Sequence, residues 1–140
     1  ERWDGWTEEN GFQDAGMNSF NHYAYGAIGA WLYGEVAGIQ SDPAAPGYKR
    51  MILRPQPGGG LTRARGELWT LYGRVVSDWR LSDGGFEWRI AVPPNTTATL
   101  HPPFEAAGVM LDGRAVPAAG LEVGAGEHLV IVSNVFTPRT

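Results

Sequence analysis

The chain has 140 residues, enough for one domain with a hydrophobic core, or for one domain and a remnant of another. Eleven basic residues against fifteen acidic ones leave a net charge of −4, and no Lys/Arg cluster marks a nucleic-acid footprint. The absence of cysteine excludes disulfides, thiolate metal sites and cysteine nucleophiles, and no apolar segment approaches the length of about 18 residues that a membrane helix needs.

The first part of the chain predicts a loop followed by one long helix. Residues 1–17 carry several glycine turn signals and no helical or strand period, so they are predicted to be a loop. From Phe20 to Ile39, apolar residues recur at steps of three and four, which predicts an amphipathic helix. Its four glycines would weaken an isolated helix by about 1 kcal/mol each, so the helix is expected to need neighbours that the rest of the chain does not supply.

A proline-rich segment, Asp42 to Gly47, ends the helical pattern and is the predicted domain boundary. Residues 1–41 are assigned to one domain and residues 42–140 to another. Most of the second domain alternates between apolar and polar residues, with glycine turns between short segments. This pattern predicts a mainly β protein, with an antiparallel β-sandwich in the second domain.

The predicted strands of the sandwich come in a regular succession. The segments with strand character are Tyr48–Leu53, Leu68–Leu81, Phe86–Val92, Thr97–Leu100, Val109–Leu111 and His128–Val135. Asp83-Gly84-Gly85 is typical of a hairpin turn, and so is Asp112-Gly113. The alternation places Trp79 and Trp88 in the core and leaves the position of Trp69 open.

The opening segment combines residue types that bind and hydrolyse sugars. Glu1, Trp3, Asp4 and Trp6 combine carboxylates with flat aromatic surfaces, as one side of a glycosidase site does; a surface loop with packed tryptophans is the other interpretation. His22 lies in the first turn of the predicted helix, where the helix dipole disfavours imidazolium. A neutral histidine there either binds a sugar hydroxyl or bonds to a backbone carbonyl.

Several motifs in this order resemble the bacterial α-L-rhamnosidases of glycoside hydrolase family 78. The resemblance spans residues 1–103 and rests on segments that include Glu1-Arg2-Trp3-Asp4-Gly5-Trp6, Gly16 to Gly26, Pro46-Gly47-Tyr48-Lys49, Tyr72-Gly73-Arg74-Val75 and Val92-Pro93-Pro94-Asn95. In that family an (α/α)6 catalytic barrel precedes a C-terminal β-sandwich. The resemblance therefore implies that residues 1–41 are the C-terminal remnant of a barrel, containing its long helix.

The same resemblance implies roles for two residues. Glu1 matches the glutamate that acts in the family as the general base, which activates water in an inverting displacement. His22 matches the histidine that contacts rhamnose. The family's general acid lies in an upstream segment that these 140 residues do not contain, and inverting hydrolysis needs two carboxyl groups about 6.5–9.5 Å apart. The chain by itself is therefore expected to be inactive.

The sequence thus predicts the C-terminal part of an inverting α-L-rhamnosidase. The expected partners are rhamnose-containing glycosides or polysaccharides and the rest of the catalytic barrel, with no cofactor, metal, nucleic acid or membrane. Two alternatives stay open at this point: a non-catalytic carbohydrate-binding or structural β-sandwich, and a related glycosidase of barrel-plus-sandwich architecture with another sugar preference.

Overall fold

The computed structural model describes residues 5–14, 16, 23–104, 108–117 and 120–133. The chain divides into two compact units, Glu1–Ala30 and Trp31–Thr140. In the first unit a small hairpin joins β1 (Trp6–Thr7) to β2 (Gly11–Phe12). This hairpin corrects the prediction of a loop over residues 1–17. Gly11 has a φ of 64°, and the backbone N–H of Asn10 donates to Thr7 Oγ1 at 3.1 Å, so a local side-chain hydrogen bond closes the turn.

The helical segment is shorter and less regular than the prediction of one helix over Phe20–Ile39. An α-helix, α1 (Tyr23–Trp31), continues as a π-helix, η1 (Leu32–Val36). Residues 20–22 lie outside the described part of the chain. At the other end Gly38 adopts a left-handed φ of 76°, which stops the helix, and Ile39 begins a strand. The three- and four-residue period therefore continued past the true end of the helix.

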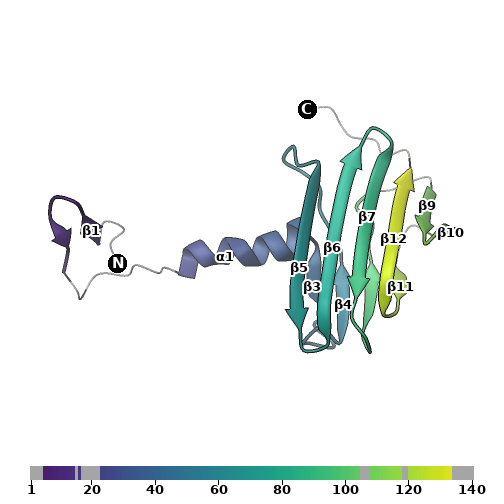
Figure 1. Ribbon diagram of the computed structural model, residues 1–140, viewed down its shortest axis with the longest axis horizontal. Coiled ribbons are helices and arrows are strands. Elements are labelled where there is room, and N and C mark those ends of the chain that lie inside the picture. Colours follow the sequence, from purple (N-terminus) through teal and green to yellow (C-terminus); the bar gives the residue numbers. More distant parts are fainter. Residues whose placement is uncertain (1–4, 15, 17–22, 105–107, 118–119, 134–140) are drawn as a thin grey trace. The chain divides into compact units, whose positions relative to one another are not determined.

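The second unit is a β-sandwich of two sheets, visible in Figure 1 as two layers of arrows. One sheet has the strand order β10-β9-β12-β7-β6-β5, and the other has the order β11-β8-β4-β3. Their bounds are β3 (Ile39–Ser41), β4 (Arg50–Leu53), β5 (Arg63–Thr70), β6 (Gly73–Ser82), β7 (Gly85–Val92), β8 (Thr97–Leu100), β9 (Gly108–Leu111), β10 (Arg114–Val116), β11 (Leu121–Val123) and β12 (Gly126–Ser133). All strand pairs are antiparallel except β4 with β8. The predicted antiparallel sandwich is confirmed, with that one parallel pair added.

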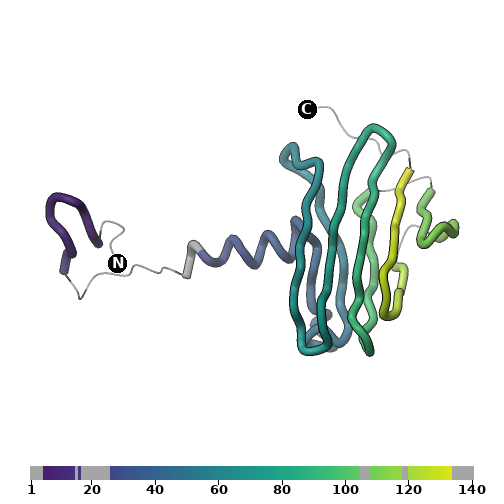
Figure 2. The backbone as a smooth tube through the Cα atoms, viewed as in Figure 1, coloured from purple at the N-terminus to yellow at the C-terminus, as the bar shows by residue number. Residues whose placement is uncertain are grey.

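Several details of the strand prediction were wrong. The predicted strand Leu68–Leu81 contains a reversal, because Leu71 and Tyr72 form the turn that joins β5 to β6; Figure 2 lets the reader follow this turn along the tube. The short strands β3, β10 and β11 were not predicted, since three residues carry too little alternation to be seen, and the prediction also missed residues 63–67 of β5. The last predicted strand, His128–Val135, corresponds to β12, and its final two residues lie outside the described part.

The core lies between the two sheets and is rich in aromatic rings. Trp79 and Trp88 are fully buried, as the alternation predicted, and the ring centroid of Phe86 lies 6.0 Å from that of Trp79 and 6.2 Å from that of Trp88. Phe104 meets Phe86 edge-on at 5.7 Å. Each buried aromatic side chain removes a large apolar area from water, so this cluster is a main source of the stability of the sandwich.

The end of η1 is held in the core by side chains of the six-stranded sheet. Trp79 Nε1 donates to the carbonyl of Val36 at 2.7 Å, and Ser77 Oγ donates to the carbonyl of Ala37 at 2.5 Å. Trp88 Nε1 in turn donates to Ser77 Oγ at 2.8 Å. Helix ends leave carbonyls without intrahelical partners, and burying such groups unpaired is costly. Here indole and hydroxyl donors satisfy them.

The other layer of the sandwich supplies further partners for the same segment. Gln40 Nε2 donates to the carbonyl of Gly34 at 2.8 Å, and the backbone N–H of Gln56 donates to the carbonyl of Glu35 at 2.9 Å. The backbone N–H of Arg54 donates to the carbonyl of Gly38 at 2.8 Å. Five successive carbonyls, from Gly34 to Gly38, are therefore paired with groups of the sandwich.

Replacing Ser77 with alanine should destabilise the sandwich by about 1–3 kcal/mol, because the substitution leaves the carbonyl of Ala37 and the indole N–H of Trp88 buried without this partner. Urea unfolding, followed by tryptophan fluorescence, measures the change. Ser82→Ala is the matched control, since Ser82 is exposed and its hydroxyl makes only a 3.5 Å contact with Gly85 O. Equal midpoints for the two variants would contradict this account of the buried hydroxyl.

Gly38→Ala should destabilise the chain, whereas Gly34→Ala should not. A Cβ on Gly38 would lie 2.1 Å from the backbone nitrogen of Pro55, and its φ of 76° is strained for alanine. A Cβ on Gly34 meets nothing within 4 Å, so alanine there should be neutral or stabilise the helical segment by up to about 1 kcal/mol. Thermal unfolding of both variants tests the pair, and a Gly38→Ala variant with an unchanged Tm would refute the close packing at Pro55.

Candidate functional site

The two residues predicted to carry the chemistry, Glu1 and His22, lie outside the described residues. Trp3 and Asp4 of the opening motif also lie outside them. Trp6, the last residue of that motif, is in β1 with 55% of its surface exposed. A large exposed indole is available to an apolar partner or to a sugar ring, so Trp6 is the only part of the predicted sugar site whose surroundings are described.

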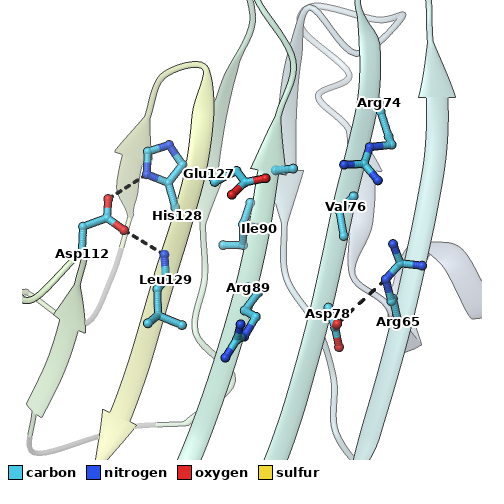
Figure 3. Close-up of a pocket in the computed structure, with 11 residues that line it drawn as sticks. Arg65, Arg74, Val76, Asp78, Arg89, Ile90, Asp112, Glu127, His128 and Leu129 are labelled. Carbon is cyan, nitrogen blue, oxygen red and sulfur yellow. Dashed lines mark hydrogen bonds and ion pairs between the residues drawn. The ribbon is translucent and has the colours of Figure 1, made fainter.

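A cavity lined by charged side chains lies on the sandwich. It is a depression of about 450 Å³ over β5, β6, β7 and β12, and Figure 3 shows its side chains. Short side chains, Val76 and Ala91, lie in its middle. Charged groups surround them, and these groups are Arg65, Arg74, Asp78, Arg89, Asp112, Glu127 and His128.

Ion pairs order part of this surface. Arg65 bonds to Glu67 at 2.6 Å, and Arg74 approaches the same carboxylate oxygen at 3.4 Å. Arg65 Nε also lies 3.9 Å from Asp78, and Arg89 bonds to Glu87 at 2.9 Å. All these arginines are at least partly exposed, so each pair contributes little to stability, about 0–1 kcal/mol. What the pairs do is hold planar donor groups at defined places on the sheet.

A second group of polar residues, at the edge of the depression, connects the turn between β9 and β10 to the strand β12. Asp112 has a φ of 50° in the turn between β9 and β10. Its Oδ1 accepts the backbone N–H of Leu129 at 2.8 Å, and its Oδ2 lies 2.8 Å from His128 Nδ1. His128 Nε2 lies 3.0 Å from the carbonyl of Gly124. Both ring nitrogens thus face oxygen acceptors, and only the imidazolium form donates from both.

The carboxyl group of Asp112 titrates below its usual range. Burial alone would raise its pKa, but hydrogen bonds from His128 and from the backbone of Leu129 outweigh burial and lower the pKa from 3.8. The charges of His128 and Arg114 act in the same direction. The ionised carboxylate is therefore the form that closes this turn onto β12.

The described residues contain no group of three or more His, Cys, Asp or Glu side chains placed to hold a metal ion. Within that same part of the chain, no helix is both long and apolar enough to cross a bilayer.

The fold defines a class of protein: a β-sandwich domain whose core holds the end of a preceding helical segment through buried hydrogen bonds. Residues 38–115 match the bacterial alpha-L-rhamnosidase C-terminal domain, and residues 1–36 match the bacterial alpha-L-rhamnosidase 6 hairpin glycosidase domain. The chain belongs to the bacterial α-L-rhamnosidase C-terminal domain family, as the motif resemblance predicted.

Relatives agree with this assignment. An alpha-L-rhamnosidase of Streptomyces avermitilis is 43% identical over 138 residues, which cover 91% of this chain and 13% of that protein. The crystal structure of the Streptomyces avermitilis enzyme complexed with L-rhamnose superposes with a TM-score of 0.74 at 41% identity, over 94% of this chain and 13% of that one. The alpha-L-rhamnosidase from Dictyoglumus thermophilum superposes with a TM-score of 0.75 at 29% identity, over 84% and 15%. The chain thus spans about an eighth of the length of the curated relative.

Sequence reasoning missed both the charged depression and the Asp112 turn as candidate sites. A signal for the first was present, since Arg63, Arg65 and Glu67 alternate along β5. The second gave no signal, because Asp112 and His128 are 16 residues apart and only the pairing of β9 with β12 brings them together.

Asp112→Asn should lower stability at neutral pH and remove part of the acid sensitivity. A carboxyl whose native pKa is depressed contributes stability above its unfolded pKa, near 3.9, and that contribution disappears as the pH falls through the native pKa. At pH 7 the variant should lose about 0.5–1.5 kcal/mol of hydrogen bonding. Urea unfolding between pH 2.5 and 7 checks this, with the exposed Asp83→Asn as control; curves for wild type and variant that stay parallel at low pH would refute it.

Proposed function

We propose that this chain is the C-terminal part of an inverting α-L-rhamnosidase that hydrolyses terminal L-rhamnose from glycosides or polysaccharides. In this proposal the residues up to 36 are the end of the catalytic barrel, and the C-terminal sandwich begins with β3 rather than at residue 42. The parent acts without a cofactor, since two carboxyl groups are sufficient for inversion.

One observation carries the proposal: two family matches follow one another along a single chain. The glycosidase match ends at residue 36 and the C-terminal domain match begins at residue 38. The carbonyls of Val36 and Ala37, at this seam, are bonded to Trp79 and Ser77 inside the sandwich. A segment that matches a glycosidase domain is thus hydrogen-bonded to the core of the sandwich, which supports an origin of both in one longer enzyme.

Glu1 is the proposed general base and His22 the proposed rhamnose-binding residue. The glutamate would take a proton from the attacking water, and the histidine would hold a sugar hydroxyl so that the anomeric carbon faces that water. The carboxylic acid that protonates the leaving oxygen must come from a segment upstream of these residues. A single carboxylate cannot act on both faces of the sugar, so the isolated chain should not turn over substrate.

Purified residues 1–140 should release no aryl leaving group from an aryl α-L-rhamnoside, because the acid partner is missing. In a polypeptide extended upstream to the length of the relatives, Glu1→Gln should lower kcat by about 10²–10⁴-fold, the usual contribution of a general base. Glu8→Gln, an exposed glutamate in the nearby hairpin turn, is the matched control.

Proton NMR of the first product should show rhamnose of inverted anomeric configuration. Turnover by the isolated chain, or a fully active Glu1→Gln variant of the extended protein, would refute the assigned roles. Retention of configuration would refute the inverting mechanism and leave the family assignment in place.

A further inference from the structure

One face of the sandwich collects arginines out of proportion to the composition of the chain. The chain carries a net charge of −4 and ten arginines. Alternation along the strands places five of them on the outer face of β5, β6 and β7, opposite the buried positions of the same strands; they are Arg63, Arg65, Arg74, Arg80 and Arg89. Three acids share this face of the three strands: Glu67, Asp78 and Glu87. The face of these strands is thus positive in an acidic chain.

Two of these arginines lie directly opposite one another. The register of β5 and β6 pairs Arg63 with Arg80, and both are exposed. Like charges in opposite positions destabilise a sheet. Glu87, the partner of Arg80 on β7, bonds to Arg89 instead. Within the described part of the chain neither Arg63 nor Arg80 forms an ion pair within 4.0 Å, so the donors of two guanidinium groups are open to a ligand.

The other end of the same face carries an exposed aromatic ring. Trp69 is the cross-strand partner of Arg74 and has 73% of its surface exposed. It lies six residues from Arg63 along β5, which corresponds to about 20 Å of strand. The depression over Val76 and Ala91 lies over the strands between these two ends. The face therefore carries an exposed aromatic ring at one end, the depression in its middle, and at the other end two adjacent arginines without an ion-pair partner among the described residues.

We propose that this face, from Trp69 to the Arg63–Arg80 pair, binds an acidic oligosaccharide, a chain that carries uronic-acid carboxylates. Guanidinium groups bind carboxylates through two parallel hydrogen bonds, and an indole face packs against the apolar face of a sugar ring. The choice of a saccharide among carboxylate ligands rests on the proposed function. The binding experiment does not use activity, so the failure of one proposal is distinguishable from the failure of the other.

Two other classes of partner fit this face less well. Protein interfaces are depleted in charged residues at their centres, whereas charged groups surround the middle of this depression. Nucleic acids bind to uninterrupted basic surfaces, whereas Glu67, Asp78 and Glu87 are interleaved here in a chain of net charge −4. An extended ligand with spaced carboxylates and hydroxyl groups matches this face better, because arginine donors and carboxylate acceptors are interleaved on β5, β6 and β7.

Isothermal titration of residues 1–140 with oligogalacturonate tests the proposal, and the fully methyl-esterified oligomer is the neutral control. Binding of the free acid should be at least about tenfold tighter than binding of the ester, since the ester removes the charge-assisted hydrogen bonds. Arg63→Gln/Arg80→Gln and Trp69→Ala should each weaken binding by about tenfold or more. Arg54→Gln, which removes one exposed arginine outside β5–β7, should leave binding unchanged.

Chemical-shift mapping on the unaltered chain gives a second readout that does not depend on how the variants fold. Shifts should be confined to β5, β6, β7 and β12. The proposal is overturned if the free acid does not bind up to millimolar concentration, if the ester binds equally well, or if Arg54→Gln weakens binding as much as the double variant. Equal affinity for a polyphosphate of the same charge would also overturn it, since that result indicates a general attraction for anions.

Discussion

The hydrogen bonds that the sandwich supplies to the carbonyls of residues 34–38 are the constraint on which the rest of the structure depends. Helix termini leave carbonyls unpaired, and burial of such groups is tolerated only where donors reach them. Here Gln40, the backbone of Gln56, Trp79, Ser77 and the backbone of Arg54 each supply one donor in turn. Because Ser77 also accepts the indole N–H of Trp88, the end of the helical segment and the aromatic core of the six-stranded sheet form one buried network.

This network changes what the boundary between the two family matches means. The matches separate at residues 36 and 38, yet the backbone there is bonded to the six-stranded sheet and to the segment that follows β4. The close approach of Gly38 to Pro55 leaves no room for a side chain at the same place. A boundary between sequence families is therefore a buried part of the folded domain here. In a longer enzyme such an attachment would fix the last helical turn of the catalytic domain to the sandwich.

The outer face of the six-stranded sheet has the opposite character. Its ion pairs are exposed and contribute little to stability, and the opposed Arg63 and Arg80 are unfavourable for the sheet by themselves. The opposed arginines thus cost stability without improving packing, which agrees with the ligand site proposed for this face. The face is built on the hydrogen-bonded strands β5, β6 and β7 rather than on loops, with β5 at the edge of the sheet.

The sequence by itself determined the mainly β fold, the inward faces of β6 and β7 and the family, because these depend on local alternation and on motifs of adjacent residues. It located Trp79 and Trp88 in the core but left the burial of Trp69 open. Alternation alone does not say which of the two faces of the edge strand β5 packs against the other sheet. Only the tertiary structure decided where the helix stops, because four of the five donors that cap it come from residues 54, 56, 77 and 79, which the fold brings to residues 35–38. The same holds for the pairing of Asp112 with His128 and for the opposed arginines. Strand register creates these contacts, and it is set by the packing of the whole sheet rather than by any segment of the sequence.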